Sequence, residues 1–142
     1  MEKTPLLKMN LCRSLFFNKI DNLPLVIPES GEFILCIKIN TAESSNIEPD
    51  PSQFLGNLLY SGQKINENPA QEQVELPQGH YLFTQCRTNT ALNKEEWLDL
   101  AIEQQKDGLW ERNKLKDLLY IRFLYEDGAF VTQIYRGIAD GD

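Results

Sequence analysis

Residues 116–138 read KDLLYIRFLYEDGAFVTQIYRGI, and this stretch decides the fold. Two runs rich in Leu, Ile, Phe, Tyr and Val flank Asp127-Gly128. That dipeptide is typical of a two-residue hairpin turn, because such a turn needs positive φ at both positions. With these two residues as the loop, Glu126 faces Ala129. The stretch therefore predicts one antiparallel hairpin with a defined register.

This register divides the side chains of the hairpin between two faces. One face carries nearly all the large apolar groups, among them Ile121, Phe123 and Ile134. The other face mixes aromatic, amide, guanidinium and aliphatic groups. Such a mixture is ordinary on an exposed sheet, but on a concave surface it suits a ligand held between rings and oriented by Arg and Gln. We name this side the mixed face; it comprises Leu118, Tyr120, Arg122, Leu124, Val131, Gln133 and Tyr135.

Length and composition limit the protein class. The 142 residues, 42% hydrophobic and 25% charged, predict a single soluble domain over 1–142 that holds an ordinary core. The net charge of -7 argues against nucleic-acid binding, which needs a Lys/Arg stripe to displace counterions. The apolar run Leu15–Phe17 is too short for a signal peptide or a membrane span. We expect a cytoplasmic protein that binds neither nucleic acid nor membrane.

Motifs for catalysis or metal binding do not occur in the sequence. One histidine, His80, excludes a multi-histidine metal site, and the three cysteines are widely separated with no C-x-x-C pair. Serine-hydrolase elbows, P-loops and zinc-protease motifs are missing as well. We therefore assign no catalytic residue, no metal and no cofactor, and we consider a binding protein more plausible than an enzyme. Cys36 and Cys86 are expected to be free, buried thiols in strands.

Periodicity predicts two further strands. The run over 33–39 places Leu35 and Ile37 on one face and is expected in the interior of a sheet, and a second strand covers 80–87. Residues 1–22 fit either a short helix or an edge strand. Residues 23–27 are apolar, but Pro24 and Pro28 lack backbone donors and indicate a loop or a sheet edge there. Polar residues and Pro indicate a loop at 40–53 and an exposed internal hinge at 63–75.

Two helices are also predicted. The longer covers 94–107, with Asn93 and Glu96 as its capping box and Gly108 as its end. A shorter amphipathic helix is expected to open at the Asp50-Pro51 cap, to carry Phe54, Leu55, Leu58 and Leu59, and to stop near Gly62. The expected fold class is therefore α+β, an antiparallel sheet with helices on one face.

A faint internal similarity relates 23–75 to 76–138. Each segment has a glycine before its strand, then an Asn-Thr-Ala tripeptide, Asn40 to Ala42 in the first and Asn89 to Ala91 in the second, and then a helix start. Duplication of one unit explains this pattern, and so does coincidence, since α+β units share turn and cap residues. The fold class therefore includes a duplicated strand-helix-strand-strand unit as one alternative.

The second half resembles a known family. The run Leu76 to Tyr81, the helix bearing Trp97, and the hairpin end Thr132 to Tyr135 are similar to GyrI-like (SHS2-type) small-molecule-binding domains over about 76–138. The resemblance implies a duplicated strand-helix-strand-strand unit with the ligand between its halves. It departs from the family at Phe123, where those domains typically carry an acidic residue. It places Tyr81, Trp97, Tyr120 and Tyr135 near the groove.

Three functions are compatible with these features. The leading hypothesis is a stand-alone small-molecule-binding module. The alternatives are a protein-interaction module that uses the same face and a small hydrolase of the resemblance family. The expected partner is a small molecule or a protein, with a homodimer as one option. The candidate ligand-binding residues are Tyr81, Trp97, Tyr120, Arg122, Leu124, Gln133 and Tyr135.

Overall fold

The computed structural model describes residues 2–24, 27–29, 31–64 and 72–139. Strands contain 49% of the residues and helices 20%. The fold is a curled, mostly antiparallel sheet with few helices, so the expected α+β class is confirmed only in part. Three helices are described: α1 (Thr41–Ser44), α2 (Pro51–Leu55) and α3 (Lys94–Trp110). The described strands are β1 (Glu2–Lys3), β2 (Leu7–Leu11), β3 (Leu15–Ile20), β4 (Glu32–Lys38), β5 (Leu58–Gln63), β6 (Gln73–Leu76), β7 (Gly79–Thr88), β8 (Leu115–Glu126) and β9 (Ala129–Ile138).

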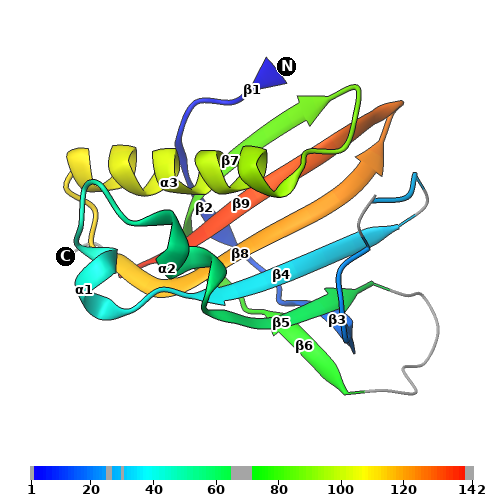
Figure 1. The fold of residues 1–142 in the computed structure, drawn as a ribbon, viewed down its shortest axis with the longest axis horizontal. Helices are drawn as coiled ribbons and strands as arrows, with labels where there is room; N and C mark the ends of the chain where they lie inside the picture. Colours follow the sequence, from blue (N-terminus) through cyan, green and yellow to red (C-terminus); the bar gives the residue numbers. More distant parts are fainter. Residues whose placement is uncertain (1, 25–26, 30, 65–71, 140–142) are drawn as a thin grey trace.

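The strands form one sheet in the order β1-β7-β9-β8-β4-β5-β3-β6, and β2 also pairs with β7. The hairpin β8-β9 lies near its centre (Figure 1). Its register is the predicted one, with Glu126 opposite Ala129. Asp127 and Gly128 have φ values of 51° and 78°, as a turn with two left-handed residues requires.

The two faces of the sheet are covered differently. Helices α1, α2 and α3 lie over one side (Figure 1), and the apolar face of the hairpin packs there through Leu119, Ile121 and Phe123. The mixed face is the inner side of the curl. Side chains from β2, β3 and β6 cover Tyr120 and Tyr135 there. Each face therefore has its own apolar cluster, and the sheet is buried on both sides.

The N-terminal segment contributes strands β2 and β3, which extend the sheet around the mixed face. Leu15 in β3 pairs with Leu76 in β6, and Leu11 in β2 pairs with Gly79 in β7. Between them, the Gln78 backbone N–H donates a hydrogen bond to the Ser14 hydroxyl at 2.9 Å. Of the two structures expected for 1–22, strand is therefore the correct one. However, β3 lies between β5 and β6, not at an edge.

The helix predicted from the Asp50-Pro51 cap to near Gly62 is correct in its first half and wrong in its second half. Asp50 caps α2, and the helix ends after five residues at its C-cap Gly56. Leu58 begins β5, which pairs with β4. The spacing of the four apolar residues fits one helical turn, but backbone pairing with a neighbouring strand outweighs so short a helical pattern. The loop expected over 40–53 also contains α1, which Asn40 caps.

Helix α3 has the predicted capping box, in which Asn93 accepts from the Glu96 N–H and the Glu96 carboxylate accepts from the Asn93 N–H. The helix continues through Gly108, which was expected to end it. A Cβ at Gly108 would lie 2.4 Å from Leu82 Cδ1, so this glycine permits close contact between helix and sheet. No helix in the described part of the chain is long and apolar enough to cross a membrane.

The structure describes only parts of the segments 23–27 and 63–75, which were expected to be a loop or sheet edge and an exposed hinge. Residues 25, 26 and 65–71 lie outside the described residues. The described ends of the second segment are strand, because β5 includes residue 63 and β6 begins at residue 73. The predicted hinge between them stays a prediction.

Candidate functional site

Six of the seven candidate residues lie together on the mixed face. They come from three adjacent strands, β7, β9 and β8, and their register brings the side chains onto one surface. Trp97 is the exception, because it lies with the helix-side cluster on the opposite face. The sheet thus separates Trp97 from Tyr81, Tyr120, Arg122, Leu124, Gln133 and Tyr135.

A chain of polar side chains crosses the mixed face. Arg122 forms an ion pair with Glu32 and donates through Nη1 to Gln133 Oε1 at 3.1 Å. Gln133 Nε2 donates to Gln85 Oε1 at 2.8 Å. The Tyr135 hydroxyl donates to Gln133 Oε1 at 2.8 Å. The predicted pairing of Arg122 with Gln133 is therefore confirmed, and protein groups already satisfy much of the hydrogen-bonding capacity of these side chains.

The tyrosines of this face pack against each other. The ring of Tyr81 meets Tyr120 at 6.2 Å and Tyr135 at 5.7 Å, both edge to face. The three residues are 4%, 4% and 2% exposed. Burial raises the pKa of Tyr81 to about 12, so its phenol is neutral at physiological pH and donates to the Pro77 carbonyl oxygen. These rings fill the interior of the curl; a ligand-binding role for them stays a prediction.

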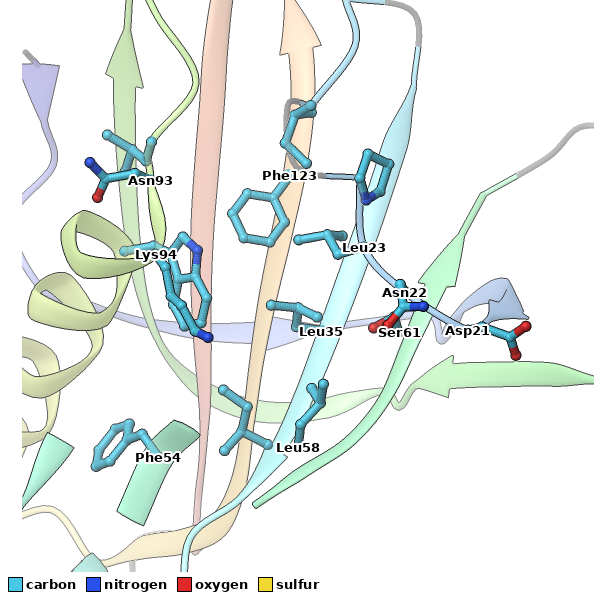
Figure 2. A pocket seen from close by; sticks show the side chains of 15 residues that line it. Asp21, Asn22, Leu23, Leu35, Phe54, Leu58, Ser61, Asn93, Lys94 and Phe123 are labelled. Carbon is cyan, nitrogen blue, oxygen red and sulfur yellow. The ribbon is translucent and has the colours of Figure 1, made fainter. Parts of the chain in front are cut away.

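Trp97 lies at the wall of a cavity on the helix side. The cavity has a volume of about 370 Å³, and the indole contacts the Phe123 ring edge to face at 6.3 Å. Figure 2 shows apolar side chains across its middle, with Asn93 and Lys94 on one side and Asp21, Asn22 and Ser61 on the other. The lining residues are Asp21, Asn22, Leu23, Pro24, Ile27, Leu35, Ile37, Phe54, Leu58, Ser61, Leu92, Asn93, Lys94, Trp97 and Phe123.

The local sequence explains how these walls form. Leu35 and Ile37 share one face of β4, as predicted, and in the structure this face is the helix side. The capping box at Asn93 starts α3 one turn before Trp97, which brings the indole over the sheet. Phe54 is fully buried on the short helix α2. The resulting site has apolar walls that suit an apolar molecule, and its charged groups lie at the rim.

Three residues that line the cavity, Ser61, Leu23 and Leu58, were not predicted as site residues. Ser61 and Leu58 lie on β5, and both fall in the stretch up to Gly62 that was predicted to be helix. Leu23 belongs to the segment 23–27, which was expected to be a loop or a sheet edge. If residues 58–63 had been predicted as a strand paired with the strand over 33–39, Ser61 could have been placed beside Leu35.

Arg136 is a second buried polar group with no predicted role. It is 1% exposed and donates to the Lys116 carbonyl at 2.8 Å, Gln105 Oε1 at 2.6 Å and Ser44 Oγ at 2.9 Å. Ser44 in turn donates to Asp117 at 3.0 Å. Burial lowers the pKa of Arg136 to about 10. This pKa is still well above 7, and the guanidinium is therefore charged at neutral pH. This network joins α1, α3, β8 and β9 and is structural.

Cys36 and Cys86 are free and buried, as predicted, whereas Cys12 is free and exposed. Burial raises the pKa of the Cys36 thiol to about 11, so this thiol is protonated and a poor nucleophile. Within residues 2–24, 27–29, 31–64 and 72–139, no group of three His, Cys, Asp or Glu side chains could hold a metal ion.

Comparison of the chain with models of protein families, with curated proteins and with solved structures found no significant match. The resemblance of residues 76–138 to GyrI-like domains therefore stays a prediction.

Proposed function

We propose that this protein binds a small, largely apolar molecule in the cavity between α3 and the sheet. One observation carries the proposal: about 370 Å³ of space lies against the Trp97 indole in a wall of buried apolar side chains. Interiors of proteins are normally close-packed. An apolar cavity of about 150 Å³ is enough to bind benzene, so this one has room for a molecule of two fused rings.

The helix side supports this function better than the mixed face does. On the mixed face, Tyr81, Tyr120 and Tyr135 occupy the space between the strands and contact each other. A protein partner that used this face would need those rings to be accessible, yet all three are buried. The geometry therefore favours a small ligand beside Trp97 over a macromolecular partner on the tyrosines.

The duplicated unit is part of the proposal. The segments 23–75 and 76–138 both follow the order strand, helix, strand, strand: β4, α1 with α2, β5 and β6 in the first, and β7, α3, β8 and β9 in the second. The shared order of elements is the support for a duplication and for the likeness to GyrI-like ligand-binding domains. The strand pairing of the two segments differs, because β8 pairs with β9 whereas β3 lies between β5 and β6. The proposed ligand, however, lies on the helix side of the sheet.

Two neighbouring leucines allow a matched test. Leu58 and Leu59 are each 51% exposed, but only Leu58 is among the residues that line the cavity. We expect Leu58→Trp to place a bulky ring in the cavity without strain in the core, and Leu59→Trp to leave the cavity open. Isothermal titration with 2-acetylnaphthalene is expected to give a Kd on the order of 10 to 100 μM for the native protein.

In this test, Leu58→Trp should weaken binding at least tenfold, and Leu59→Trp should change it less than twofold. Both variants should unfold at about the temperature of the native protein, because both sites are half exposed. If the native protein does not bind the naphthyl ketone, or if the two variants bind it equally well, the cavity is not the site.

A further inference from the structure

Ser61 is a polar residue inside the apolar cavity. It is 3% exposed and sits on β5 opposite Leu35, so its side chain points to the helix side and lines the cavity (Figure 2). Its hydroxyl forms no hydrogen bond with another described residue, and it faces the open space of the cavity instead of being enclosed by protein atoms. Buried hydroxyls are nearly always hydrogen-bonded, because an unpaired one costs free energy. This hydroxyl is therefore expected to form its hydrogen bond with a molecule in the cavity, either water or a ligand that replaces the water.

We propose that Ser61 is the polar anchor of the cavity and that the natural ligand is a neutral, apolar ring compound carrying a carbonyl or hydroxyl oxygen. This inference rests on the proposed function. The Ser61 hydroxyl would donate to a ligand carbonyl, or exchange a hydrogen bond with a ligand hydroxyl. A single oriented bond of this kind fixes the pose of a ligand that the apolar walls alone would hold loosely.

The remaining walls argue for a neutral ligand. Leu35, Ile37 and Phe123 surround the interior and offer no group that pairs with a charge. The charged residues of the lining, Asp21 and Lys94, are exposed and lie on opposite sides of the cavity in Figure 2. A charge buried between the apolar walls would be unpaired, which is costly, whereas one neutral oxygen matches one hydroxyl.

A pair of isosteric compounds and one conservative substitution test this inference on the full chain. The compounds are 2-acetylnaphthalene and 2-isopropenylnaphthalene. They have nearly the same shape, but the first has a carbonyl oxygen where the second has a methylene group. The native protein should bind the ketone about three- to tenfold more tightly, the effect of one hydrogen bond. In Ser61→Ala the affinity for the ketone should fall by that factor. Its affinity for the hydrocarbon should stay within twofold.

The melting temperature of Ser61→Ala is the second readout. A hydroxyl without a protein partner contributes no hydrogen bond to the folded state, so the variant should melt at or above the native temperature. A clear decrease would mean that the hydroxyl already has a partner in the protein, and would overturn the inference. Equal binding of both compounds to the native protein would overturn the anchor while leaving the cavity as the site. Failure of both compounds to bind would overturn the proposed function and this inference together.

Discussion

Replacing Arg136 with methionine tests the polar network that joins the helices to the sheet. Methionine has a similar length and fits an apolar surrounding, so the change removes three hydrogen bonds with little loss of volume. The Lys116 carbonyl and Gln105 Oε1 lose their buried donors. An acceptor left unpaired costs about 1–3 kcal/mol. The release of a desolvated guanidinium offsets part of this cost, because burial of a charge is itself unfavourable.

These contributions give a net loss of about 2–4 kcal/mol in the free energy of unfolding. For a chain of this size, 1 kcal/mol corresponds to roughly 3–5 °C in melting temperature, so Arg136→Met should melt roughly 6–20 °C below the native protein. Urea unfolding at pH 7, followed by circular dichroism, measures the free energy directly. Loss of the network should also loosen α1, which is bound to Arg136 through Ser44.

The control is Arg13→Met, which removes the same group at an exposed position. Substitutions at such positions usually change stability by less than about 0.5 kcal/mol. If Arg136→Met is as stable as Arg13→Met, the buried bonds contribute no net stability and the structural role given to Arg136 is refuted. A more stable Arg136→Met variant would mean that the desolvation cost of the guanidinium exceeds the value of its bonds.

Two further predictions concern the thiols. The pKa of Cys36 is raised by burial to about 11, above its ordinary value of 9.0, so the unfolded chain releases this proton first and the free energy of unfolding falls as pH rises from 9 towards 11. Between pH 8 and 10 the ionisation of Cys36 should lower the free energy of unfolding of the native protein by about 1 kcal/mol. Over the same interval the free energy of unfolding of Cys36→Val should fall by about 1 kcal/mol less than that of the native protein. An equal fall in both proteins would contradict the raised pKa of Cys36. Ellman's reagent at pH 8 should modify one thiol, Cys12, in the native protein and all three in denaturant, and rapid reaction of all three without denaturant would show that the core thiols are accessible.

The central hairpin is the part of the fold that local sequence determines best. Asp127-Gly128 determines the turn, and the turn determines the register, so the two faces of β8 and β9 follow from alternation alone. The pairing of Arg122 with Gln133 is a direct consequence of this register. The capping box of α3 is equally local, since Asn93 and Glu96 are three residues apart.

Features that depend on distant parts of the chain were not predictable in this way. The apolar spacing near Leu58 fits one turn of helix as well as a strand, and only pairing with β4 makes it a strand. The partners of Arg136 come from α1 and α3, and Ser44 lies 92 residues away. The side of the sheet that receives Trp97 is decided by the packing of α3 against the apolar face. For these reasons the sequence predicted the mixed face but not the cavity on the other side.

Methyl NMR during titration with 2-acetylnaphthalene tests the central claim most directly, because β4 carries reporters for both faces. Leu35 and Ile37 line the cavity, whereas Ile34 of the same strand belongs to the cluster on the mixed face. A ligand beside Trp97 should shift the methyl signals of Leu35 and Ile37 in proportion to occupancy and leave those of Ile34 nearly unchanged. Shifts confined to Ile34, or no shifts at saturating compound, would contradict the account.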